Sequence, residues 1–140
     1  MDMNLEVVTL PVSDVDRAKS FYESLGWRFD IDLVVSDDMR TVQFTPPHSG
    51  CSIQFGKGGT AAEPGSIDGL ILVVEDIDAA RDDLIGRGVD VSDVVEARPP
   101  GIEAPEGRSY FARASFSDPD GNGWQLQEIT TRLPGREWED

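Results

Sequence analysis

Two segments of the chain carry the same order of apolar and polar positions. Residues 6–12 form a short, mostly apolar run that is typical of a strand, and apolar residues then recur at helical spacing over 15–25. The same order returns over 69–74 and 77–85. Each segment therefore predicts a strand followed by a helix.

Residues suited to helix ends stand at the expected places in both segments. Ser13 or Asp14 can cap the first helix and Asp76 the second, because a short polar side chain accepts a hydrogen bond from the first helical turn. Gly26 and Gly88 follow the last turns, where glycine tolerates the left-handed conformation that ends a helix.

Each helix is followed by three further predicted strands, which gives the pattern βαβββ twice. We expect the strands at 27–34, 40–45 and 51–55, and again at 89–94, 109–117 and 123–130. Residues 57–66 are typical of a linker, and the Pro/Gly-rich stretch 97–108 predicts a long loop, either a lid or a disordered surface segment.

The two segments are also alike residue by residue. At an offset of 62 the identical pairs are Leu10/Leu72, Val12/Val74, Asp14/Asp76, Asp16/Asp78, Ala18/Ala80 and Gly26/Gly88. Such a repeat indicates one structural unit used twice. We predict an α+β fold of tandem βαβββ modules, with module 1 at about 5–56 and module 2 at about 68–130, within a single domain spanning 1–140.

Strand alternation assigns each side chain to one of two sheet faces. The face toward the helices would carry Val8, Leu10, Val12, Val42, Phe44, Cys51, Ile53, Phe55, Leu70, Leu72, Val74, Trp124 and Leu126. The opposite face would carry Val7, Thr9, Pro11, Gln43, Ser52, Gln54, Ile71, Val73, Gln125 and Gln127. Its mixture of apolar and neutral polar groups is typical of a ligand cavity, and the alternative is an open sheet facing water.

Composition narrows the partners. The 140 residues carry a formal net charge of −15 from 27 acidic and 12 basic residues, which disfavours binding to nucleic acid. This charge would attract cationic molecules; the alternative is that it serves only solubility. No apolar run reaches the roughly 18 residues of a membrane helix, and no signal peptide is visible, so we expect a cytoplasmic protein that does not bind membranes.

Single residues with reactive or aromatic side chains allow two interpretations each. His48, in the turn TPPHSG, is either a general base or an exposed turn residue, and the lone Cys51 is either a nucleophile or an inert buried thiol. Five aromatic residues near strands either wall a cavity or pack in the core: Trp27, Phe29, Tyr110, Phe111 and Trp124. Trp138 anchors a polar C-terminal stretch that is either loose or packed on a second copy of the chain.

Three stretches together resemble a known superfamily. They are LPVSDVDRAKSFYESLGW, LVVEDIDAARDDLIGRG and FSDPDGNGWQLQEI, and in this order they resemble the vicinal oxygen chelate superfamily of glyoxalases, bleomycin-resistance proteins and dioxygenases. The resemblance implies paired βαβββ modules whose mixed sheets curve around a cavity, commonly in a homodimer.

In metal-dependent members of that superfamily, four cavity side chains hold one divalent ion. By spacing, the resemblance places these positions at Val7, Gln54, Gly69 and Gln125. Valine and glycine offer no ligand, and a glutamine carbonyl is a weak one. We therefore predict no metal and no cofactor. Glu6, Glu128 and His48 are the substitutes if the strand register differs.

Three functions follow as hypotheses. The first is a metal-free protein, similar to the bleomycin-resistance type, that binds a small molecule in a sheet-lined cavity; cationic and aromatic compounds are the candidates. The second is an enzyme of the same superfamily, a lyase, dioxygenase or thiol transferase that uses a divalent metal. The third is a regulatory or interaction module whose cavity is vestigial.

Overall fold

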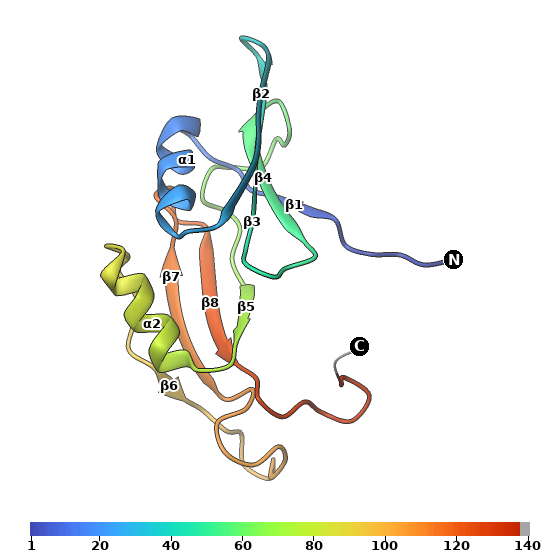
Figure 1. Ribbon diagram of the computed structural model, residues 1–140, viewed down its shortest axis with the longest axis vertical. Coiled ribbons are helices and arrows are strands. Elements are labelled where there is room, and N and C mark those ends of the chain that lie inside the picture. Colours follow the sequence, from blue (N-terminus) through green and yellow to red (C-terminus); the bar gives the residue numbers. More distant parts are fainter. Residues whose placement is uncertain (138–140) are drawn as a thin grey trace. The chain divides into compact units, whose positions relative to one another are not determined.

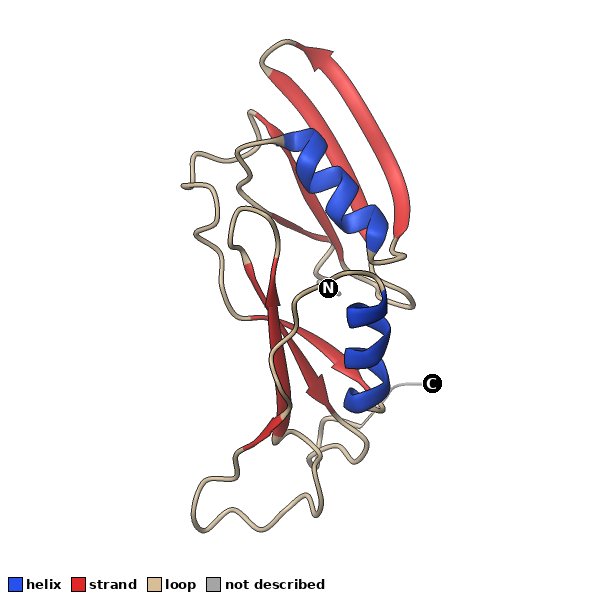
Figure 2. Cartoon of the chain, turned by 90° about the vertical axis from the view of Figure 1, so that its left-hand side faces the viewer, coloured by secondary structure: helices blue, strands red, loops and turns tan. Residues whose placement is uncertain are grey.

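The computed structural model describes residues 1–137, so Trp138 lies outside the described part of the chain. The chain forms two compact units (Figure 1). Unit 1 comprises Met1–Asp68 together with Ser117–Asn122, and unit 2 comprises Gly69–Phe116 together with the residues from Gly123 onward. Each unit is one βαβββ module, as the repeat predicts, and each contains one helix and one mixed four-stranded sheet (Figure 2).

Unit 1 is built from five elements. They are β1 (Val7–Thr9), α1 (Val15–Ser24), β2 (Arg28–Ser36), β3 (Met39–Thr45) and β4 (Ser52–Lys57). The strand order is β1-β4-β3-β2, with β1 parallel to β4 and the other pairs antiparallel. Helix α1 packs on β3 and β4. The opposite face of this sheet carries no helix of its own unit.

Unit 2 repeats this plan with a shorter edge strand. Its elements are β5 (Leu70–Val74), α2 (Ile77–Gly86), β6 (Val95–Glu96), β7 (Ala112–Ser117) and β8 (Gly123–Glu128). The strand order is β5-β8-β7-β6, with β5 parallel to β8 and β6 antiparallel to β7. Helix α2 packs on β8.

The predicted helix ends are confirmed. Asp14 and Asp76 are the N-caps, and their carboxylates accept hydrogen bonds from the backbone N–H of Arg17 and of Ala79. Gly26 and Gly88 follow the last turns with φ of 79° and 88°, a conformation in which a Cβ would be strained.

The strand expected at 89–94 is wrong. This segment is irregular, and only Val95–Glu96 pair with β7 as a strand. Val89 and Val91 are buried, so the apolar pattern reflects packing rather than strand pairing. The hydroxyl of Ser92 accepts the backbone N–H of Ser115, which replaces a backbone carbonyl that a regular ladder would use.

Alternation predicts the core well. Leu10, Val42, Phe44, Ile53 and Phe55 are buried on the helix side of unit 1, as expected. Tyr22 of α1 completes an aromatic cluster, with its ring centroid 5.4 Å from that of Trp27 and 5.5 Å from that of Phe55. In unit 2, Trp124 stacks on Phe116 with ring centroids 6.3 Å apart. Trp27 and Trp124 are therefore core residues rather than cavity walls.

No helix within residues 1–137 is both long enough and apolar enough to cross a membrane.

Candidate functional site

The predicted open face of unit 1 is assembled as a cluster of paired side chains. Thr9 lies beside Gln54 in the β1–β4 register, Val7 lies beside Ser52, and Gln43 lies opposite Gln54 in the β3–β4 register. The Gln54 amide donates to the Gln43 carbonyl oxygen over 2.8 Å. The two amides are therefore partnered with each other.

An aspartate that alternation did not identify joins this face. A bulge in β2 between Phe29 and Ile31 interrupts the alternation, and Asp30 accepts hydrogen bonds from the Gln43 amide and the Thr45 hydroxyl. Burial would raise the pKa of Asp30, but hydrogen bonds from Arg28, Thr45 and Gln43 outweigh it and lower that pKa. A bulge leaves no clear mark in the pattern FDIDLVV, so strand alternation does not predict it.

The polar groups of unit 1 are thus largely satisfied among themselves. The hydroxyls of Thr45 and Ser52 lie 2.6 Å apart, and Arg28 donates to both Thr45 and Asp30. The hollow at this sheet is small, about 130 Å³, and includes Thr9, Gln54 and Arg40. That volume is below the several hundred Å³ typical of drug-sized ligand pockets.

The open face of unit 2 borders a larger cavity. Gln125 pairs with Ile71 and Gln127 with Val73 across the β5–β8 ladder. The cavity measures about 490 Å³, and Gln125 and Gln127 line it together with Ser92, Val95, Ala97, Pro99, Tyr110, Phe111, Arg113, Ala114 and Ser115. Ile71 and Val73 are exposed and are not among its lining residues.

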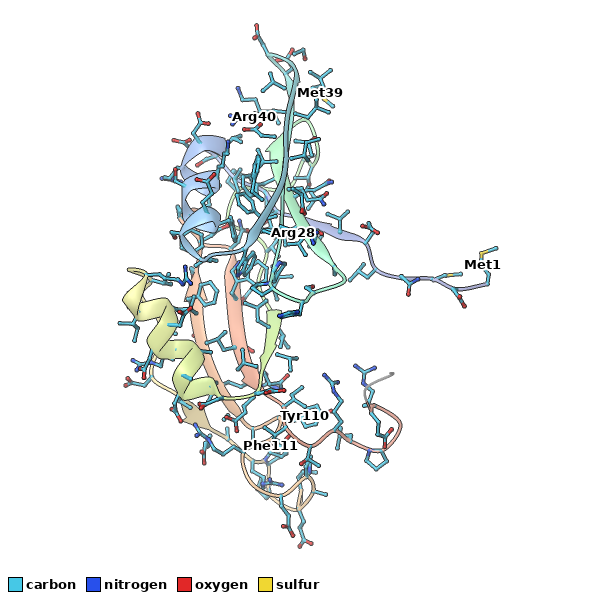
Figure 3. All side chains as sticks on the ribbon, viewed as in Figure 1. Met1, Arg28, Met39, Arg40, Tyr110 and Phe111 are labelled. Carbon is cyan, nitrogen blue, oxygen red and sulfur yellow. The ribbon has the colours of Figure 1, made fainter. Side chains whose placement is uncertain are left out.

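Aromatic side chains form one wall of this cavity. Of the five candidates, Tyr110 and Phe111 line it, at the point where the long loop leads into β7 (Figure 3). Gln127 donates to the Tyr110 carbonyl over 2.9 Å, which fixes the wall against β8. Phe29 is exposed elsewhere, in unit 1, and packs edge-on against Phe44.

The loop over residues 97–108 is held by two arginines. Arg98 donates to the carbonyls of Ile102, Pro105 and Gly107, and its guanidinium lies 4.0 Å from the centre of the Phe111 ring. Arg108 forms ion pairs with Asp78 and Glu96. The start of the loop contributes Ala97 and Pro99 to the cavity.

The residues considered as general base, nucleophile or substitute ligands are Glu6, His48 and Cys51 in unit 1 and Glu128 in unit 2. His48 is exposed in its turn with φ of 63°, and Cys51 is half-buried directly before β4. Glu6 is exposed. Glu128 is buried and accepts the backbone N–H of Ile77 over 3.1 Å, so its carboxylate binds the start of α2 instead of facing the open side.

The donor set at the four implied metal positions does not fit a divalent ion. Gln54 and Gln125 are neutral amides, and their neighbours on the parallel strands, Thr9 and Ile71, supply no imidazole or carboxylate. Among residues 1–137 no group of three or more His, Cys, Asp or Glu side chains could hold a metal ion.

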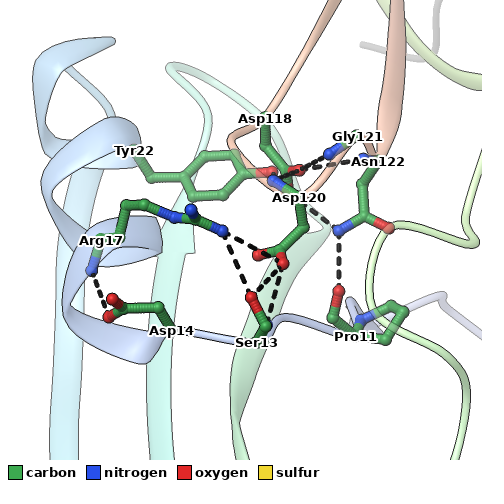
Figure 4. A network of polar contacts seen from close by, with 9 residues as sticks. All are labelled: Pro11, Ser13, Asp14, Arg17, Tyr22, Asp118, Asp120, Gly121 and Asn122. Carbon is green, nitrogen blue, oxygen red and sulfur yellow. Dashed lines mark hydrogen bonds and ion pairs between the residues drawn. The ribbon is translucent and has the colours of Figure 1, made fainter.

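The turn Asp118–Asn122 has a structural role that its composition did not reveal. One oxygen of the buried Asp118 accepts the backbone N–H groups of Asp120, Gly121 and Asn122 (Figure 4). Its other oxygen accepts from the Tyr22 hydroxyl and the Asn122 amide, each over 2.9 Å. The carboxylate therefore holds both the turn and the core of unit 1.

The same turn also contacts the segment between β1 and α1. The Asn122 amide donates to the Pro11 carbonyl, and Asp120 accepts from the backbone N–H and the hydroxyl of Ser13 (Figure 4). Arg17 lies 3.3 Å from the Asp120 carboxylate. Although this turn joins β7 to β8, it is an integral part of unit 1.

Comparison with known proteins gives a family and several structural neighbours. Residues 4–126 match the model of the Glyoxalase/Bleomycin resistance protein/Dioxygenase superfamily. No curated protein matches the chain.

Among solved structures, the chain is similar to TnmS3, an antibiotic binding protein from Streptomyces sp. CB03234, with 30% identity and a TM-score of 0.73 over 92% of this chain and 98% of that one. A glyoxalase/bleomycin resistance protein from the same Streptomyces shows 31% identity and a TM-score of 0.68, over 89% and 99%. A superfamily member from Sphaerobacter thermophilus DSM 20745 shows 30% identity and a TM-score of 0.70, over 91% and 98%.

Proposed function

Because the chain belongs to the Glyoxalase/Bleomycin resistance protein/Dioxygenase superfamily, we propose that it is a metal-free binding protein that sequesters a small aromatic molecule in the cavity of unit 2. The observation that carries the proposal is the cavity of about 490 Å³ with Tyr110 and Phe111 on one wall and Gln125 and Gln127 on the sheet. Its volume and its mixture of aromatic and amide groups suit a drug-sized ligand.

An antibiotic is the leading class of ligand. The similar protein TnmS3 is described as an antibiotic binding protein, and the two chains match over nearly their whole lengths. Aromatic rings offer flat surfaces for a planar compound, while glutamine amides can both donate and accept hydrogen bonds. Sequestration requires only tight, reversible binding and no catalytic group.

We also propose that the protein forms a homodimer and lies in the cytoplasm. A second copy would have exposed apolar side chains available on β2, where Ile31, Leu33 and Val35 are exposed. Light scattering coupled to size exclusion would measure the mass in solution.

The test is a fluorescence or calorimetric binding screen against aromatic antibiotics, with a Phe111→Ala variant as the cavity control. We expect at least one compound to bind, and the variant to weaken that binding. An expression strain should also tolerate more of the bound compound. A screen in which no compound binds, at concentrations well above those that inhibit growth, would contradict the proposal.

Elemental mass spectrometry separates this function from a metal-dependent reaction. We expect no stoichiometric Ni, Mn, Fe or Zn after loading and gel filtration, because the donor set at the implied positions is neutral. A metal retained at one ion per chain would overturn the metal-free part of the proposal and favour a superfamily enzyme.

A further inference from the structure

Arg113 places a cationic group at the cavity of unit 2. It lies on β7, opposite Val95 of β6, and lines the cavity beside Gln125. Its Nη1 donates to the Gln125 Oε1 over 3.2 Å. That is one of the five N–H donors that a guanidinium carries.

Within residues 1–137 Arg113 has no carboxylate partner, unlike most arginines of this chain. Ion pairs with aspartate or glutamate hold Arg17, Arg28, Arg40, Arg81, Arg87 and Arg108. Arg98 directs its guanidinium to loop carbonyls and the Phe111 ring. In a chain with 27 acidic and 12 basic residues, an arginine that lines a cavity without a carboxylate partner is unusual.

The local charge and the total charge predict opposite ligands. The net charge of −15 attracts cations over the whole surface. Salt screens such distant charges beyond about 8 Å at physiological ionic strength, whereas a ligand in the cavity would contact Arg113 directly. The contacting group therefore decides which charge binds, and the overall charge affects mainly the approach.

The Gln125 contact also orients the guanidinium. Donation from Nη1 to the Gln125 carbonyl oxygen leaves the Gln125 amide free to donate, so an arginine and an amide donor lie side by side. A planar guanidinium next to an amide matches a carboxylate or phenolate oxygen and offers nothing to an ammonium group. Tyr110 and Phe111 supply the flat surface for a ring attached to that oxygen.

We infer that the cavity of unit 2 selects a planar aromatic compound that carries an anionic oxygen, with Arg113 and Gln125 binding the oxygen and Tyr110 and Phe111 contacting the ring. This rests on the proposed binding function and names its ligand class. It also reverses the expectation of a cationic ligand that total charge suggests.

Three naphthalene probes of matched shape test the inference on the full chain: 2-naphthoate, 2-naphthalenemethanol and 2-naphthylmethylammonium. Titration calorimetry at neutral pH should show 2-naphthoate binding roughly tenfold or more tightly than the ammonium probe, as expected for a charge-assisted hydrogen bond. The neutral alcohol should fall between them.

Variants assign the preference to Arg113. Arg113→Gln should weaken 2-naphthoate binding about tenfold and leave the neutral alcohol unchanged, because only the charged contact is lost. Arg113→Lys should keep part of the preference for 2-naphthoate, since lysine retains the positive charge but lacks the planar set of guanidinium N–H donors. Arg87→Gln removes the same charge directly after α2, where Arg87 pairs with Asp83, and should change no affinity.

The outcomes separate the inference from the function on which it rests. Equal or tighter binding of the ammonium probe would overturn the inference while the binding function stands. Equal losses in the Arg113→Gln and Arg87→Gln variants would also overturn it, because bulk charge would then explain the preference. Failure of all three probes to bind would count against the proposed function and the inference together.

Discussion

The open faces of the two units come from one repeated pattern, but their polar side chains have different partners. In unit 1, Gln54 donates to Gln43, Gln43 donates to Asp30, and the hollow that Gln54 lines is about 130 Å³. In unit 2, Gln125 accepts from Arg113, which has no carboxylate partner in the described part of the chain, and it lines a cavity of about 490 Å³. The repeat therefore supplies the scaffold, and local departures from it decide which face offers a binding cavity.

Two departures account for the difference. The bulge in β2 brings Asp30 onto the face of unit 1, where it uses the amide and hydroxyl donors. In unit 2 the corresponding edge is the two-residue β6, followed by a long loop. Arg113 lies opposite Val95 in this short strand, Tyr110 and Phe111 lie directly before β7, and all three line the cavity.

The largest expected effect comes from Asp118→Ala, which tests how far unit 1 depends on its buried carboxylate. Three backbone N–H groups, the Tyr22 hydroxyl and the Asn122 amide would lose their acceptor. We expect the free energy of unfolding to fall by about 4 kcal/mol, as for other broken buried networks. Urea denaturation measures it, with Asp37→Ala in the exposed β2–β3 turn as the control.

A loss below about 1 kcal/mol, similar to that of the Asp37→Ala control, would show that Asp118 is not a stabilising centre.

Two glycine substitutions compare the units through backbone conformation. Gly65 has φ of 80°, and a Cβ there would lie 2.1 Å from the Asp120 carbonyl oxygen, whereas Gly88 has φ of 88° and open space around it. We expect Gly65→Ala to cost about 3 kcal/mol and Gly88→Ala about 1 kcal/mol, since the second is strained only by its φ. Thermal unfolding of the two variants should separate them; equal melting temperatures would contradict the predicted clash.

Acid stability should report the ion pairs of unit 1. The Arg40 guanidinium and Lys19 lower the pKa of Asp32 from 3.8 to about 2, against the effect of burial. A carboxyl with a lowered folded-state pKa adds stability above its unfolded pKa and loses it as pH falls through the folded one. Stability from Asp32 should therefore be present above about pH 4 and disappear between about pH 4 and 2.

Asp32→Asn should cost about 1–2 kcal/mol at neutral pH and flatten the loss of stability between about pH 4 and 2. Chemical denaturation at a series of pH values gives both quantities. If wild type and variant lose stability in parallel over that range, the Arg40–Asp32–Lys19 contacts do not set the acid response.

The smallest predicted effect addresses the comparison of the two faces directly. Gln125→Ala should weaken binding of an aromatic ligand about five- to tenfold, the value of one hydrogen bond, while Gln54→Ala should leave it nearly unchanged. Calorimetry with the same ligand measures both. A larger loss from Gln54→Ala would move the site to unit 1, where alternation also placed cavity residues.

Much of this fold follows from short-range signals. Asp14 and Asp76 cap their helices and Gly26 and Gly88 end them, because capping and positive φ are properties of single residues. The core positions Val42, Phe44 and Phe55 follow from strand alternation. The irregular segment 89–94 escaped prediction, because buried valines look the same in a strand and in an extended loop.

Short-range signals predict only part of the candidate site. Gln125 and Gln127 were placed on the open face by alternation, and they do line the cavity. Arg113 was not singled out, although its position on a strand was predicted. Nothing in the sequence shows that an arginine will lack an acidic partner in so acidic a chain, since ion pairs form between residues distant along it.

Local sequence patterns are enough to predict the repeated βαβββ units, their helix ends and the face to which most strand residues point, because these depend on neighbours within a few positions. The three-dimensional structure is needed to show that Asp118 and Asn122 complete the core of unit 1 and that Asp30 accepts from the Gln43 amide. It is also needed to show that Arg113, at the cavity of unit 2, has no carboxylate partner among residues 1–137. Each of these depends on contacts between segments far apart in the chain, which no local pattern specifies.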